Sequence, residues 1–580
     1  MEIDRKPTNT RRLGSALLIV CAALASSVQA VAIAVTITVN TTSMAVANDG
    51  QCSLIEAIIA ANTDTASGAL AGECPAGSGA DTIVLSNATY TLTAVFDPVW
   101  KDGLPPATSA ITLQGNGAVI QRAAAAPDFR LWRVSSTGNL TLHNVTLRGG
   151  RRLDARNGAA IYVDGGALSA HDCTFEDNLA QGGFGSAIYA DGGDVDLHDM
   201  TLRDNEPGAL GGEDATLTLN QTTITTNQGA GVELFGDSAL HLAQSSITDN
   251  QSDGISGSPV QNGVLTIADS QITGNDGLGV VIANSQVQIT DSVIQNQGDI
   301  GLSLIDSATA ITGTLISGNG DRGILSFNGS VQLYESMVTG NAAAAGFPGG
   351  LDSRGTAVVI RRSTLANNTP KNITHSGQSL QIVNSTLSGV GEQLTFDDAD
   401  VSLQHVTLAV TSGNPVGILA MGGAITFSNS IVDRCYRGPF APTFTSLGYN
   451  IDRSNQCGFT QPGDIQGLDP DTILAPLANN GGPTHTRALL AGAAAINAIP
   501  VGSNNCQPGS SLDQRGYARA GGAGQGGSGC DIGAFEYASG PPQPTATPTR
   551  TPTPTATPTR TPTATPTPPV RRLWLPVIQR

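Results

Sequence analysis

Two short segments of the sequence carry a tyrosine and an aspartate at the same spacing. Residues 161–166 read Ile-Tyr-Val-Asp-Gly-Gly, and residues 188–193 read Ile-Tyr-Ala-Asp-Gly-Gly. If the segments stack, their isoleucines face a core and the tyrosines and aspartates face outward. Stacked carboxylates repel unless a cation or a proton lies between them. We therefore predict a ligand surface for Ca²⁺ or a sugar, with a solvated edge as the alternative. Its residues are Tyr162, Asp164, Tyr189 and Asp191.

Three histidines also recur at similar spacing. His143, His171 and His198 each lie four residues before a repeated hydrophobic residue, so we expect them to stack in three successive repeats. Imidazoles about 5 Å apart can bind Zn²⁺ or Cu²⁺. A coincidental row of surface histidines is the interpretation that the sequence favours over a metal site.

The cysteines fall into close sequence pairs. We predict disulfides within the pairs, although six cysteines allow fifteen connectivities, and they indicate an oxidising compartment. Cys173 lies in a column of small residues and is predicted to be a buried free thiol. The predicted pairs are Cys52 with Cys74, Cys435 with Cys457, and Cys506 with Cys530.

One hydrophobic position recurs through most of the chain, at spacings of 21 to 28 residues. An aliphatic residue lies five positions before it, a serine or threonine two positions before it, and an asparagine three positions after it. The unit is L-x-x-S-x-I-x-x-N, and we expect Ile120 to start the series. The repeated residues are Leu147, Phe175, Leu202, Ile224, Ile247, Ile272, Ile294, Ile316, Val338, Leu365, Leu387, Leu408 and Val432.

This spacing also fits a leucine-rich repeat, but two features argue against a horseshoe. A hydroxylic residue replaces the middle leucine, and each repeat continues in a short glycine-punctuated alternation, such as residues 231–234 and 279–282, that indicates a strand. We therefore predict an all-β right-handed parallel β-helix, a β-solenoid of about fourteen rungs. Its asparagine column is predicted to be scaffold, because identical residues stack and hydrogen-bond along the solenoid.

An open solenoid end would promote aggregation, so we expect caps at both ends. At the N-terminal end, Ser53 and Glu56 form a capping box that opens an amphipathic helix reaching about Asn62. The cysteine pair Cys52 and Cys74 would hold this helix in place.

The two ends of the chain differ from the repeats. Residues 1–30 combine basic residues, an apolar run and a small-residue cleavage site, and are predicted to be a signal peptide. Residues 538–569 form a Pro/Thr-rich linker that we expect to be disordered and extended. Residues 570–580 are basic and apolar, and we predict either an anchoring or sorting tail or an end without function.

Three segments of the chain resemble known surface proteins. Residues 48–62, with Cys52-Ser-Leu-Ile-Glu-Ala57, resemble the start of bacterial proteins of the CSLREA type, although Ile55 replaces the family's arginine. Residues 477–483, 513–516 and 530–536 resemble the choice-of-anchor Q domain. The resemblance implies export and display at the cell surface, and no catalytic residues. We therefore expect a cap and first rungs at 31–100 and the repeats at 101–434, and the resemblance places the anchor-like region at 435–537.

Charge and motifs limit the function classes. A net charge of −18 disfavours nucleic acid and anionic lipid as partners. We find no complete catalytic constellation, no transmembrane helix in the mature chain and no required cofactor, so we expect adhesion, matrix or glycan binding at an extracellular glycan or cell-envelope component. A polysaccharide lyase or glycoside hydrolase and a purely structural envelope protein are the alternatives. Asp513, Arg515 and Glu536 are predicted to be structural ion pairs.

Overall fold

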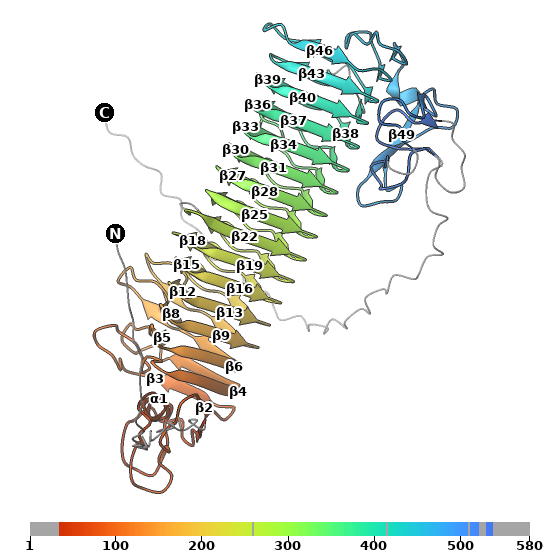
Figure 1. Ribbon diagram of the computed structural model, residues 1–580. Coiled ribbons are helices and arrows are strands. Elements are labelled where there is room, and N and C mark those ends of the chain that lie inside the picture. The colour runs from red at the N-terminus through yellow and green to blue at the C-terminus, as the bar shows by residue number, and fades with distance from the viewer. Residues whose placement is uncertain (1–33, 258–259, 413–415, 508–510, 521–528, 538–580) are drawn as a thin grey trace, which may run out of the picture.

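The computed structural model describes residues 34–257, 260–412, 416–507, 511–520 and 529–537. Within these residues the chain winds into one elongated parallel β-solenoid of about fourteen turns, with a single α-helix at its N-terminal end (Figure 1). The predicted signal peptide, Pro/Thr-rich linker and tail lie outside the described residues.

Each regular rung contains three short strands. One rung consists of β18 (Val232–Phe235), β19 (Ala239–Ala243) and β20 (Ser246–Thr248). Every strand pairs in parallel with its equivalent in the next rung, so that Ile247 on β20 lies beside Ile272 on β23 (Gln271–Thr273). These strands confirm the predicted β-helix, because they occur where the glycine-punctuated alternation placed them.

The first strand of each rung contributes to a 14-stranded parallel sheet. This sheet carries the candidate site, and its strands alternate inward and outward residues. In rung order they are β5 (Trp132–Val134), β8 (Ile161–Asp164), β12 (Ile188–Asp191), β15 (Leu210–Glu213), β18, β21 (Ile255–Gly257), β24 (Val280–Ala283), β27 (Leu302–Ile305), β30 (Ile324–Phe327), β33 (Leu351–Arg354), β36 (Ile373–Ser376), β39 (Leu394–Asp397), β42 (Ile418–Ala420) and β45 (Cys435–Arg437).

The repeated hydrophobic column fills the core. Its members from Leu147 to Val432 are fully buried and lie in register from strand to strand. The column begins one rung earlier than the sequence predicts, because Tyr90 on β3 (Thr89–Leu92) lies beside Ile120 on β4 (Ala110–Arg122). Tyr90 does not fit the aliphatic pattern, so the sequence did not mark it. Its buried hydroxyl forms hydrogen bonds with Ser86.

The asparagine column forms a continuous ladder inside one turn of the solenoid. The side-chain amide of Asn227 donates to the carbonyl of Asn250 at 2.8 Å, and Asn250 donates in the same way to Asn275 at 2.9 Å. Gln297 continues the ladder where the asparagine is missing, accepting from Asn275 at 3.1 Å. A buried donor or acceptor without a partner is costly, so these contacts make the turns of successive rungs mutually dependent.

The predicted N-terminal cap is present. Helix α1 (Leu54–Thr63) begins with a capping box in which Ser53 accepts from the backbone of Glu56 while the Glu56 carboxylate accepts from the backbone of Ser53. All three predicted disulfides form, and Cys173 is a buried free cysteine, as expected. Burial raises the pKa of the Cys173 thiol to about 11, which leaves it unreactive. Among the described residues, no helix has the length and apolar character to cross a membrane.

The C-terminal region folds back along the side of the solenoid, where β49 (Leu474–Ala478) lies beside the later rungs (Figure 1). The amide of Gln514 bonds Thr364 at 2.9 Å, and its carbonyl accepts from Thr386 at 2.6 Å. Arg519 reaches Asn384 at 3.0 Å. These contacts attach the region to rungs that precede it by more than a hundred residues.

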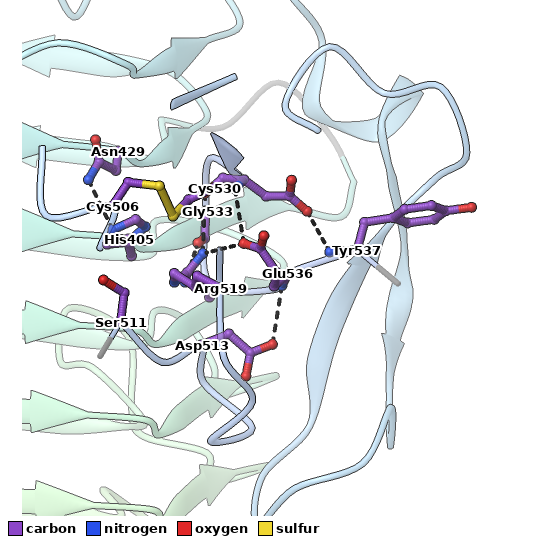
Figure 2. Close-up of polar contacts among 12 residues, drawn as sticks. His405, Asn429, Cys506, Ser511, Asp513, Arg519, Cys530, Gly533, Glu536 and Tyr537 are labelled. Atoms are coloured by element: carbon purple, nitrogen blue, oxygen red, sulfur yellow. Dashed lines mark hydrogen bonds and ion pairs between the residues drawn. A yellow bond between two sulfur atoms is a disulfide. The ribbon is translucent and has the colours of Figure 1, made fainter. Parts of the chain in front are cut away.

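Buried ion pairs occur within this region. Asp513 pairs with Arg515 at 2.7 Å, and Glu536 pairs with Arg519 at 3.3 Å, so the ion pairing predicted for Asp513, Arg515 and Glu536 is present. Figure 2 shows the pair of Arg519 and Glu536, and the charge of Arg519 acts on His405 of the solenoid.

The asparagine ladder predicts a specific loss of stability in the variant Asn250→Leu. The substitution removes the acceptor of Asn227 and leaves buried polar groups unpaired, so we expect the free energy of unfolding to fall by about 3 kcal/mol. Urea denaturation measures it. The neighbouring Gln251 is exposed, and Gln251→Ala is the control, with an expected change of less than about 0.5 kcal/mol. Equal stability of the two variants would contradict a stabilising ladder.

Candidate ligand-binding face

The candidate site lies on the outer side of the 14-stranded sheet, at its first rungs. The connections that lead into this sheet are unusually long here. Residues 149–160 precede β8 and residues 177–187 precede β12, whereas a typical rung has a six-residue connection such as 226–231 before β18. In repeat proteins such insertions gather on one face, often the binding face. We call the outward residues of β5, β8, β12, β15 and β18, together with Trp100, the aromatic–acidic face.

Stacking brings the predicted residues together as the sequence indicated. Tyr162 lies beside Tyr189 and Asp164 beside Asp191 in the register of β8 and β12. The two tyrosine rings are parallel within 1°, with centroids 6.1 Å apart. Glu213 on β15 continues the aspartate column by one more rung.

The carboxylate column is stabilised by hydrogen bonds that run diagonally between rungs. Each carboxylate accepts a hydrogen bond from a donor on the preceding rung, which offsets the repulsion that we expected a cation or a proton to relieve. The pairs are Arg133 with Asp164 at 3.5 Å, Tyr162 with Asp191 at 2.7 Å, and Tyr189 with Glu213 at 2.9 Å.

The tyrosines differ in exposure, which corrects one expectation. Tyr162 and Asp164 are partly exposed and Asp191 is exposed, but Tyr189 is only 2% exposed although it points away from the core. Its ring lies over Gly211, where a Cβ atom would come within 2.6 Å of the ring. Tyr189 therefore stacks on Tyr162 and donates to Glu213, and it offers almost no surface to a ligand.

Aromatic rings and guanidinium groups alternate at the N-terminal end of this face. Trp100 lies 6.4 Å from Tyr162 between ring centroids. The guanidinium of Arg133 lies 4.4 Å from the centre of the Trp100 ring, and that of Arg130 lies 4.6 Å from the centre of the Tyr162 ring. Such cation–π contacts fix the orientation of both rings.

A buried carboxylate positions the two arginines. Asp102 is fully buried and accepts from Arg130 at 2.9 Å and from Arg133 at 3.0 Å. Burial lowers the pKa of Arg130 to about 10, so the guanidinium stays charged at neutral pH. Burial, and then the hydrogen bond and charge of Asp191, raise the pKa of Tyr162, which keeps its hydroxyl protonated and able to donate.

Glu233 is the carboxyl group of this face with the most unusual environment. It lies on β18, one rung after Glu213, and it accepts a hydrogen bond from the backbone N–H of Gly185 at 3.4 Å. Burial raises its pKa to about 7, and the charge of Asp253 adds to the effect. Phe184, from the long connection 177–187, packs on Phe235 with ring centroids 4.7 Å apart and helps to cover this part of the face.

The predicted histidine stack is present on the neighbouring sheet. The rings of His143, His171 and His198 are parallel, with centroids 4.9 and 5.1 Å apart. Asp196 pairs with His198 at 3.0 Å, and Ser169 hydrogen-bonds His171 at 2.9 Å. In the part of the chain that the structure describes, no group of three or more His, Cys, Asp or Glu residues is placed to hold a metal ion. Face-to-face stacking does not converge ring nitrogens on one point, so the metal interpretation has no geometric support.

Several residues of the face were missed in the sequence. Glu213 had a usable signal, because it follows Asp191 by 22 residues, the common rung length. Trp100 and Asp102 precede the regular repeats, so no periodicity marked them. Glu233 looked like an ordinary outward residue, and only its packing sets it apart.

The fold and this face define a parallel β-solenoid with longer connections on one side. The family model of the right-handed β-helix region matches residues 130–282 and 260–456. These matches together span more than half of the chain, which therefore belongs to the right-handed β-helix family. The winding predicted from the sequence is thereby confirmed.

Several solved structures are similar to this chain at low sequence identity. The A-module of the Azotobacter vinelandii mannuronan C-5 epimerase AlgE6 is 14% identical, with a TM-score of 0.35, over 67% of this chain and 91% of its own. A pectate lyase is 13% identical, with a TM-score of 0.25, over 87% of this chain and 96% of its own. PfbA, a surface adhesin of Streptococcus pneumoniae, is 9% identical, with a TM-score of 0.24, over 63% of this chain and 85% of its own.

None of these low similarities identifies a function, since one fold serves many functions. No curated protein sequence matches the chain significantly.

The raised pKa of Glu233 predicts a pH dependence of stability. Its pKa in the folded state is about 7, above the ordinary value of 4.5, so the folded state binds the proton more tightly. The stability that this proton provides is complete below pH 4.5 and is lost as the pH rises through 7. We therefore expect the stability of Glu233→Gln, measured relative to the wild type, to increase as the pH rises from 4.5 to 7. Thermal unfolding of both proteins across this range measures the difference, and parallel curves would contradict the prediction.

Proposed function

We propose that this chain is a secreted, cell-surface β-helix protein that binds an uncharged extracellular glycan through the aromatic–acidic face. The observation that carries the proposal is the prearranged row of Trp100, Tyr162 and the carboxylates of Asp164 and Asp191. Stacking and hydrogen bonds fix these groups before any ligand arrives, which lowers the entropic cost of binding.

The chemistry of the face suits a sugar ring. Aromatic side chains supply flat apolar area at little conformational cost, and partly exposed carboxylates accept hydrogen bonds from hydroxyl groups. Acidic groups outnumber unpaired basic ones here, because Arg130 and Arg133 already pair with Asp102. An anionic polysaccharide would therefore be repelled, whereas an uncharged one would not.

The setting outside the cell rests on separate observations. Three disulfides favour an oxidising compartment. The predicted signal peptide and the resemblance to CSLREA-type and choice-of-anchor Q proteins support export and display. In this proposal the solenoid presents the face, and the linker and tail, residues 538–580, hold it at the envelope.

A glycan array, followed by calorimetry on the best ligand, tests the binding function. Trp100 is partly exposed and Asp191 is exposed, so Trp100→Ala and Asp191→Asn should fold normally. Removing an aromatic contact typically costs about 2 kcal/mol or more at a binding hot spot, so we expect a roughly thirtyfold or greater weakening of binding in Trp100→Ala. We expect smaller weakening in Asp191→Asn.

Tyr334 provides the matched control. It is a partly exposed tyrosine on β31 (Ser330–Tyr334), which belongs to a different sheet of the solenoid. Tyr334→Ala should bind like the wild type. Failure of the wild type to bind any glycan, or equal binding by all variants, would overturn the proposal. Repeating the titration with Ca²⁺ and with a chelator shows whether a cation takes part.

A polysaccharide-cleaving activity is a second candidate because of Glu233. A carboxyl group with a pKa of about 7 can act as a general acid at neutral pH, and Glu213 lies one rung away on the same face. A reducing-end assay on the bound glycans tests this role. Cleavage that is lost in Glu233→Gln with binding retained would establish an enzyme, and absence of product in the wild type would leave the binding function alone.

A further inference from the structure

A third long connection enters the same sheet much further along the solenoid. Residues 340–350 precede β33, whereas the rungs before and after have six-residue connections, 318–323 and 367–372. This insertion presents Phe347, whose side chain is 41% exposed. The Phe347 ring is nevertheless held in one position by its neighbours.

Two arginines hold the Phe347 ring. The guanidinium of Arg322 lies 4.3 Å from the ring centre, and that of Arg354 lies 5.9 Å from it. Arg354 also lies 5.5 Å from the ring centre of Phe327, which points outward from β30. Two phenylalanine rings and two guanidinium groups thus form a second cluster, which we call the distal cluster.

A buried carboxylate positions this cluster, as Asp102 does at the other end. Asp352 has no exposed side-chain surface and accepts from Arg322 at 3.0 Å and from Arg354 at 2.9 Å. A buried ion pair adds little to stability compared with apolar packing. It does fix the orientation of the planar guanidinium groups, and the Arg354 side chain remains 43% exposed.

The distal cluster and the aromatic–acidic face lie on one straight track. Both belong to the outer side of the 14-stranded sheet, and seven rung steps separate β12 from β33. At about 4.8 Å per step this is roughly 34 Å. A parallel sheet is regular along this direction, so the two clusters have a fixed separation.

The surface between the clusters is uncharged. The outward residues of β21, β24, β27 and β30 are serine or apolar residues, in a chain with a net charge of −18. They include Val281, Ile305 and Leu325, which are partly exposed. Acidic residues such as Asp253 and Asp299 lie in the connections at the edge of this track. This distribution disfavours an anionic polymer and allows an uncharged one to lie along the strands.

We infer that the distal cluster is a second binding subsite, and that the ligand is an extended, uncharged polysaccharide chain lying along the solenoid axis from Trp100 to Phe347. The inference rests on the proposed glycan-binding function and adds the class of ligand and its direction. A chain that reaches both clusters gains a second contact at high effective concentration, whereas a short oligosaccharide occupies only one.

Binding measured against chain length tests this inference. The probes are cello-oligosaccharides and chito-oligosaccharides from the disaccharide to the octasaccharide, titrated by calorimetry. We expect the affinity of the wild type to rise by roughly a hundredfold once the chain can span both clusters. Phe347→Ala should abolish this rise and leave the affinity for short oligosaccharides unchanged. Phe347 is at an exposed loop position, so the variant should keep its melting temperature.

The controls separate this inference from the proposed function. Tyr334→Ala should show the full rise with length, and Trp100→Ala should weaken both short and long chains. Short oligosaccharides that bind without a rise, or a rise that persists in Phe347→Ala, would overturn the second subsite while the proposed function stands. If neither series of oligosaccharides binds the wild type at any length, this assignment of the ligand fails, and the glycan array decides the proposed function separately.

Discussion

The structure depends on the parallel stacking of rungs about 4.8 Å apart, which places each residue directly on its equivalent in the next rung. This constraint explains why the same residue types recur in columns. An asparagine in the turn can donate to the next asparagine only if every rung turns at the same place, as in the ladder through Asn227, Asn250 and Asn275. A single rung could not satisfy these groups, so the solenoid is stabilised by neighbours and not by local structure.

The same constraint shapes the candidate site. Stacking forces like charges together, and the chain offsets this by shifting each donor one rung from its acceptor, as Tyr162 does with Asp191. Insertions cannot enter the strands without breaking the register, so extra residues collect in the connections before the 14-stranded sheet. The outer side of this sheet therefore combines a rigid row of strand residues with side chains such as Trp100, Phe184 and Phe347 that come from irregular segments.

The C-terminal region lacks the rung pattern and docks on the solenoid through both apolar side chains and buried polar groups. Asp513, Asp531, Glu536, Arg515 and Arg519 are all buried in this region. Figure 2 shows Asp513, Arg519 and Glu536 among them. Burial, and then the charge of Asp531, raise the pKa of Glu536 to about 7. Ion pairs of this kind give a contact a defined geometry and little net stability, which fits a region that attaches to one place on a repetitive surface.

The sequence by itself determined the period, the inward column, the asparagine ladder, the capped helix and the cysteine pairs, because each rests on spacing or on residues close in the chain. It also predicted that Tyr162 and Asp164 stack on Tyr189 and Asp191, because the repeat fixes the register of the strands. Only the tertiary structure decided that Tyr189 is covered, through the space that Gly211 leaves for its ring. The environment of Glu233 and the docking of the C-terminal region were likewise decided only there, because burial and long-range contacts depend on irregular segments that no periodicity describes.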